Sequence, residues 1–159
     1  MLSIDIVCVG KIKEKFFCEA ILEYSKRLSK YCKLNIVELP DEKIPNNPSN
    51  KQLEDIKQKE CNNIITHIKK DSFVIALDLK GKQFSSEELS TYIDNLCLTT
   101  SHITFIIGGS LGLTDKLLSI FNIILCFSKM TFPHQLIRVF LLEQIYRSFK
   151  ISNGEVYHK

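Results

Sequence analysis

Short apolar, β-branched segments alternate along this chain with longer segments of helical periodicity, and this alternation constrains the fold more than any other feature. Chains of this kind build a mainly parallel sheet with helices on both faces, so the sequence predicts an α/β fold. No internal repeat, linker or low-complexity tract interrupts the pattern, which favours a single domain over residues 1–159. The expected strands are SIDIVCVG from Ser3, KLNIVELP from Lys33, SFVIALDL from Ser72 with a turn at Gly81, ITFIIGG from Ile103 and NIILCF from Asn122.

Helices are expected in the intervening segments, and several carry start signals. Ser49 or Asn50 is expected to cap the second helix, and Ser85 or Ser86 the third. Pro133 suits the first position of the last helix, with Thr131 as its cap. The expected helical ranges are 15–32, roughly 51–69, 85–96, a short helix from residue 114, and 134–150.

The composition excludes several classes of protein. With 45% apolar and 25% charged residues, the chain is typical of a globular domain. No segment has the length of a membrane-spanning helix and the N-terminus does not read as a secretory signal, so we expect a cytoplasmic protein. The cysteines stand singly, without a C-x-x-C pair, which argues against a metal site and predicts reduced, buried thiols. They are Cys8, Cys18, Cys32, Cys61, Cys97 and Cys126.

A glycine-rich turn follows the fourth expected strand in FIIGGSLGL, which contains Gly108, Gly109 and Gly112. It matches neither a dinucleotide fingerprint nor a P-loop. Alone, it fits a structural turn as well as a ligand-binding one. Two further turns, LDLKGK from Leu77 and SKMTFP from Ser128, are expected at the same sheet edge, where open α/β folds bind ligands.

These three turns are expected to enclose one pocket. Its polar groups would come from the main chain, and its apolar walls from Leu77, Met130 and Phe132. Such a pocket suits a flat heterocycle such as adenine, whose edge offers both donors and acceptors. The pocket lacks the cationic cluster that a triphosphate would require.

The last expected helix is apolar over an arc of about 200°. That arc is wider than one sheet contact needs, which suggests a second apolar partner, most economically another copy of the chain. Arg138 falls within the arc and must meet an acid, a carbonyl array or a ligand. Glu143 and Arg147 are expected to form a helix-surface pair. His134, at the helix N-terminus, is expected to be neutral.

The motifs FIIGGSLGL, LCFSKMTFPHQ, RVFLLEQIYRSFKI and the terminal YHK, with the opening VGKIKEKF and ELPDEK, resemble the RlmH family of SPOUT-class methyltransferases. The resemblance covers essentially the whole chain. It implies a homodimer with a deep trefoil knot in the C-terminal half and S-adenosylmethionine bound in the knot. It also implies methylation at N3 of a pseudouridine in a 23S rRNA stem-loop of the ribosome. By motif match, the positions that would bind S-adenosylmethionine are Leu77, Gly108, Phe127, Ser128, Lys129, Met130, Thr131 and Phe132.

The hypotheses about catalytic residues also depend on this resemblance. His158 or Tyr157, reaching across from a partner subunit, would contact the target base, and Arg138 would orient the RNA or the tail. Relatives often carry a basic residue at the position of Asn153 and a proline at that of Val156, which bears on RNA contacts by the tail. The formal charge of +3 is concentrated at the two ends of the chain and permits an anionic partner without requiring one.

Two alternatives remain open at this point. The first is an α/β module that binds a nucleotide or RNA without catalysis. The second is a small NAD-type or phosphate-transfer enzyme, which the missing motifs disfavour. Binding of S-adenosylmethionine distinguishes the methyltransferase from both.

Overall fold

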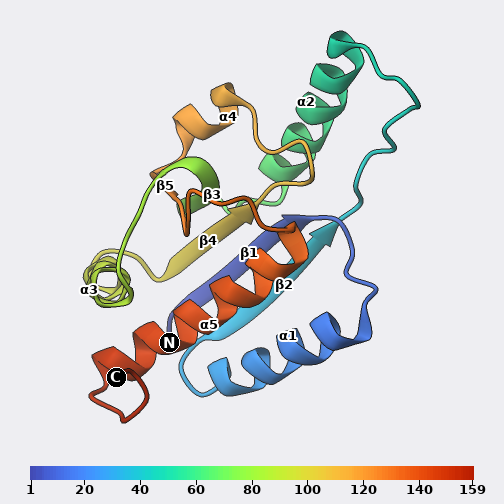
Figure 1. Ribbon diagram of the computed structural model, residues 1–159. Coiled ribbons are helices and arrows are strands. Elements are labelled where there is room, and N and C mark those ends of the chain that lie inside the picture. Colours follow the sequence, from blue (N-terminus) through green and yellow to red (C-terminus); the bar gives the residue numbers. More distant parts are fainter.

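A five-stranded, entirely parallel sheet forms the centre of the computed structural model, which describes residues 1–159 (Figure 1). Its strands lie in the order β2-β1-β4-β3-β5. In the middle of the sheet, Ile6 pairs with Ile36 on one side and Phe105 on the other. The predicted α/β fold is confirmed. The strands are β1 (Ser3–Val9), β2 (Lys33–Leu39), β3 (Phe73–Lys82), β4 (His102–Ile107) and β5 (Ile123–Leu125).

Helices cover both faces of the sheet, as predicted (Figure 1). On one face, Leu28, Ile93 and Leu141 contribute to a core beneath α1, α3 and α5. On the other, Ile64 and Leu117 contribute to a second core beneath α2 and α4. The β-branched strands thus bury side chains in both directions, as parallel strands do. The helices are α1 (Lys15–Leu28), α2 (Asn50–Thr66), α3 (Ser86–Cys97), α4 (Asp115–Ile120) and α5 (His134–Ser152).

Helix α5 lies on the sheet and contacts both α1 and α3. Leu141, Leu142 and Ile145 are fully buried there. Helices α1 and α3 thus cover much of the wide apolar arc within one chain, so the arc alone does not require a second subunit. A homodimer stays a prediction that depends on the family resemblance.

The helix start signals are confirmed at two of three sites. Ser49 and Ser85 form complete capping boxes with Gln52 and Glu88. At α5, however, Pro133 itself is the N-cap residue and no side chain caps the helix. The expected cap, Thr131, lies two residues before Pro133.

Strand β3 runs through Gly81 instead of turning there. A methyl group added at Gly81 would lie 2.6 Å from the carbonyl carbon of Leu125, so the absent side chain lets the two backbones approach closely. At this point the register shifts, and Lys82 also pairs with Leu125. The main-chain N–H of Cys126 then donates to the Lys82 carbonyl at 3.0 Å, where the chain leaves the short β5.

All six cysteines are free thiols, but they are not all buried. Cys18 on α1 and Cys97 at the end of α3 are exposed, contrary to expectation, because both lie on the outer side of a surface helix. None of the helices combines the length and apolar character needed to cross a bilayer.

Candidate functional site

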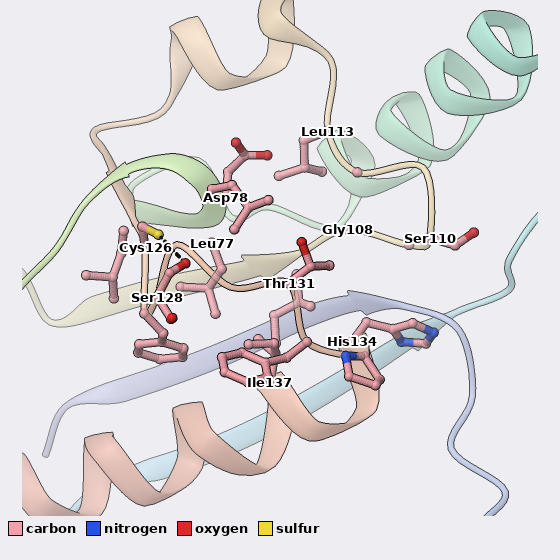
Figure 2. Close-up of a pocket in the computed structure, with 18 of the residues that line it drawn as sticks. Leu77, Asp78, Gly108, Ser110, Leu113, Cys126, Ser128, Thr131, His134 and Ile137 are labelled. Carbon is pink, nitrogen blue, oxygen red and sulfur yellow. Dashed lines mark hydrogen bonds between the residues drawn. The ribbon is translucent and has the colours of Figure 1, made fainter.

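A cavity of about 760 Å³ opens at the carboxyl ends of β3, β4 and β5 (Figure 2). Leu77, Gly108 and Met130 line this one space, as predicted, but the first wall comes from the second half of β3 and not from a turn. This volume is typical of a small-molecule site. Of the eight residues matched to cofactor-binding positions, the seven that line the cavity are Leu77, Gly108, Phe127, Ser128, Met130, Thr131 and Phe132. The eighth, Lys129, is exposed and does not line it.

The glycine turn forms one wall of the cavity. The N–H of Gly112 donates to the carbonyl of Gly109 at 3.0 Å, and Gly112 has a φ of 76°. A methyl group added at Gly108 would lie 3.1 Å from the Gly112 carbonyl carbon and from the Leu113 side chain. The turn is therefore too tight for larger residues, and its glycines offer only main-chain atoms to a ligand.

The loop between β5 and α5 forms the opposite wall and is organised by its own short-range hydrogen bonds. The thiol of Cys126 donates to the Ser128 carbonyl at 3.0 Å, and Ser128 Oγ accepts from the Met130 N–H at 3.0 Å. Met130 is 71% exposed, and Phe132 packs edge-to-face against Phe140 with centroids 5.6 Å apart. The loop thus supplies a flexible thioether and an aromatic ring at the mouth of the cavity.

Five polar residues of the cavity were missing from the sequence-based site: Asp78, Lys80, Ser110, His134 and Gln135. Asp78 directly follows Leu77, and its carboxylate accepts from the Lys80 N–H at 3.0 Å. Its place near the end of the expected strand SFVIALDL was a usable signal. Nothing in the sequence indicated that His134 would turn toward the end of β1, where a methyl group at Gly10 would lie 3.0 Å from His134 Cε1.

The imidazole of His134 is neutral, in agreement with the prediction, but for a different reason. Burial lowers its pKa, and the nearby charge of Arg138 lowers it further. His134 Nδ1 is buried and has no hydrogen-bond partner within the chain. Such an atom is costly unless a ligand or a water molecule pairs with it.

Arg138 is 1% exposed and lies behind the cavity wall. Its Nη1 pairs with Glu38 Oε2 at 2.6 Å, and its Nη2 donates to the Gly10 carbonyl at 3.0 Å. The same Glu38 oxygen accepts from the Ile12 N–H at 2.9 Å. This network joins α5 to the end of β2 and to the β1–α1 connection. It supports the structural alternative for Arg138, since a side chain so buried cannot contact RNA directly.

The C-terminal tail docks along α5, at the opposite end of that helix from the cavity (Figure 1). Tyr157 donates to Glu143 Oε1 at 3.1 Å and lies under the guanidinium of Arg147. Arg147 also donates to His158 Nδ1 at 3.1 Å, so the proton of that ring is on Nε2, which lies 2.6 Å from a Glu87 oxygen. The predicted Glu143–Arg147 pair is confirmed, but it is partly buried beneath the tail and not on the open surface.

Two properties of this tail limit its chemistry. Burial and the hydrogen bond to Glu143 raise the pKa of Tyr157 to about 12, so its hydroxyl is a donor at neutral pH. The docked tail lies away from the cavity of its own chain (Figure 1).

No cluster of three or more His, Cys, Asp or Glu side chains has the arrangement needed to hold a metal ion.

Known proteins resemble this chain over essentially its whole length. The sequence model of a family described as "Predicted SPOUT methyltransferase" matches residues 2–158. The chain is 64% identical, over 99% of its length and 100% of the relative's, to ribosomal RNA large subunit methyltransferase H of Clostridium botulinum (strain Kyoto / Type A2). It is 58% identical over the same shares to the protein of that name from Clostridium acetobutylicum.

Among solved structures, a probable methylase family protein from Haemophilus influenzae Rd KW20 aligns with a TM-score of 0.54 at 13% identity. The alignment covers 98% of this chain and 70% of that one, and it shows a shared fold. Together with the full-length sequence matches, it shows that the chain belongs to the ribosomal RNA large subunit methyltransferase H family of SPOUT methyltransferases.

Proposed function

We propose that this chain transfers a methyl group from S-adenosylmethionine to N3 of a pseudouridine in 23S ribosomal RNA. The observation that carries the proposal is the single cavity into which Leu77 of β3 and Gly108 and Met130 of the two following turns converge. The relatives that are 58% to 64% identical over their full length support the choice of RNA, since their name specifies the large ribosomal subunit.

The lining of the cavity fits the adenosyl end of S-adenosylmethionine. The glycine turn offers main-chain groups that can bond the edge of adenine, and Leu77 and Phe132 offer apolar surface to its faces. We assign the binding to the seven lining positions matched to the family and place Lys129 at the rim. When bound, S-adenosylmethionine supplies a methyl group activated by the adjoining sulfonium.

The residues of the chain must then align the acceptor nitrogen N3 with the methyl group and accept the proton that N3 loses. The bond from N3 to the methyl carbon forms as the sulfur–methyl bond breaks, and the N3 proton must leave. Tyr157 keeps its own proton at neutral pH and is suited to donate a hydrogen bond to the developing negative charge on the base. His158 Nδ1 accepts from Arg147 in the docked tail, so His158 can take the proton only after this hydrogen bond is broken and Nδ1 is turned to the base.

We infer that the tail performs this role in a homodimer. The tail of each chain lies at the far end of α5 from its own cavity, and a two-fold axis between the chains can bring it to the cavity of the partner. The knot that the family implies would lie among the segments around the cavity, and it would hold their turns in fixed relation.

We further propose that the β1–α1 connection binds RNA phosphates. Lys11 and Lys13 are exposed there, and Lys15 is exposed at the start of α1. Gly10, where this connection begins, lies beside His134 of the cavity lining. Contacts of this kind make the affinity for rRNA decrease with added salt.

Methyl incorporation from labelled S-adenosylmethionine tests the proposal. The substrates are naked 23S rRNA, free large subunits and assembled ribosomes, all prepared from cells that lack this methylation. Incorporation at N3 of a pseudouridine in at least one of the three supports the proposal. If S-adenosylmethionine binds but none of the three is methylated, the non-catalytic binding module is favoured instead.

A further inference from the structure

A buried carboxyl group lies directly behind the glycine turn. It belongs to Glu60 of α2, which is 6% exposed and is followed by the buried Cys61. Glu60 Oε2 accepts from the main-chain N–H of Glu42 at 3.0 Å. Glu42 makes a second contact with α2, because its side chain pairs with Lys59 Nζ at 3.2 Å. The carboxyl group thus ties α2 to the start of the β2–α2 loop.

The same carboxyl group also abuts the glycine turn. A methyl group added at Gly109 would lie 3.2 Å from Glu60 Oε1 and 3.5 Å from Oε2. It would also lie 3.1 Å from Val9 Cγ1. Glu60 therefore occupies the space in which a side chain of residue 109 would lie, and it supports the turn from the side opposite the cavity.

This placement is unfavourable for a carboxyl group unless it is compensated. Burial raises the pKa of Glu60, and the neighbouring Asp41 and Glu42 carboxylates raise it further, while only the Glu42 N–H lowers it. An apolar side chain would cover this part of α2 without the desolvation cost. The hydrogen bond and the support of the turn are what an apolar residue could not reproduce.

We propose that Glu60 is a positioning residue, which sets the shape of the glycine turn and thereby the affinity of the cavity for the cofactor. This inference rests on the proposed function, since the cofactor is taken to be S-adenosylmethionine. Glu60 does not line the cavity, so it acts through Gly109 and not by contact.

Three variants test the inference, with S-adenosylhomocysteine as the probe in calorimetric titration. Glu60→Ala removes the carboxyl group, and we expect it to weaken binding about tenfold. Glu60→Asp keeps the charge but shortens the side chain, so we expect a similar loss. Glu60→Gln can still accept from the Glu42 N–H, so we expect affinity within about threefold of wild type.

Ile64→Val is the matched control, since Ile64 is buried one turn further along α2 and does not line the cavity. It should lower the melting temperature and leave the affinity unchanged. The inference is overturned if Glu60→Asp binds as tightly as wild type, or if Ile64→Val weakens binding as much as Glu60→Ala does.

A second readout separates this inference from the proposed function. Amide hydrogen exchange of residues 108–113 is measured on the ligand-free protein. We expect faster exchange in Glu60→Asp than in wild type, and no change there in Ile64→Val. If the wild type fails to bind S-adenosylhomocysteine, the proposed function fails, while the exchange rates still decide whether Glu60 holds the turn. Unchanged exchange in Glu60→Asp overturns its positioning role.

Discussion

At the scale of single residues, the site depends on polar groups buried just behind the cavity. One cluster of paired polar groups consists of Arg138, Glu38 and the Gly10 carbonyl. A second consists of Glu60 and the Glu42 N–H. Each joins a loop at the carboxyl edge of the sheet to a helix. Because a buried polar group must be paired, these residues restrict the loops to few conformations.

Replacement of Arg138 tests how much the cluster of Arg138, Glu38 and the Gly10 carbonyl stabilises the fold. Arg138→Met keeps much of the side-chain volume but leaves the Gly10 carbonyl unpaired and Glu38 without its counter-ion. Because Glu38 is itself about one-third exposed, we expect a loss of about 2–4 kcal/mol, at the lower end of what a broken buried pair costs. Urea unfolding at fixed protein concentration measures it. Lys15→Met, which breaks the exposed pair with Glu19, should leave the midpoint nearly unchanged, and equal losses in the two variants would contradict the structural role.

His134 should make stability depend on pH. Its pKa in the folded chain lies below the ordinary value of about 6.5, so the unfolded chain binds the proton first as the pH falls. Stability should therefore decrease from about pH 7 downward until the folded pKa is passed. Thermal unfolding between pH 7.5 and 5.5 should show a smaller decrease in His134→Asn than in wild type. The exposed His67→Asn is the control, and identical slopes in wild type and His134→Asn would refute the assignment.

At the scale of elements, the sequence predicted the five strands and five helices because each carries an undisturbed periodicity or a cap. What it did not indicate was contact between distant elements. The extension of β3 through Gly81 depends on the approach of Leu125, and the buried arc of α5 depends on α1 and α3. Such contacts leave no trace in local periodicity.

The candidate site was likewise predictable where strand order decides it and unpredictable where contacts between distant residues decide it. The carboxyl ends of parallel strands share one sheet edge, so the convergence of Leu77, Gly108 and Met130 was predictable, although Leu77 lies in β3 and not in a turn. Glu60 was not, since a glutamate that follows Lys57 and Lys59 on an amphipathic helix is typical of a solvated face. The family resemblance, and not periodicity, supplied the identity of the cofactor and of the RNA.

Gly81 provides a test at this scale. In Gly81→Ala the new methyl group would lie within 2.8 Å of three backbone atoms of Ile124 and Leu125, which cannot move independently. We expect a loss of about 1–3 kcal/mol from overpacking, and weaker binding of S-adenosylhomocysteine because the following loop is displaced. Gly154→Ala, at a φ of 64° with open space around it, should lower the melting temperature but leave binding intact. Normal binding by Gly81→Ala would show that β5 does not position the loop.

At the scale of the whole molecule, the proposed homodimer would build each active site from two chains. This predicts complementation between two inactive variants. One is Gly108→Leu, whose cavity is obstructed, and the other lacks residues 157–159. Random mixing makes half of the dimers mixed, each with one complete site, so activity should recover to about a quarter of the wild-type level. Activity no greater than that of the separate variants would show that the tail does not act across the dimer.

The most direct measurement is a titration of the ¹⁵N-labelled protein with S-adenosylhomocysteine, followed by amide chemical shifts. The largest changes should fall on Leu77, Gly108 and Met130, because their turns form one main-chain binding site. Changes confined to the second hollow of the surface, around Lys30, Tyr31 and Thr100, would contradict this assignment. So would the absence of any change at millimolar ligand.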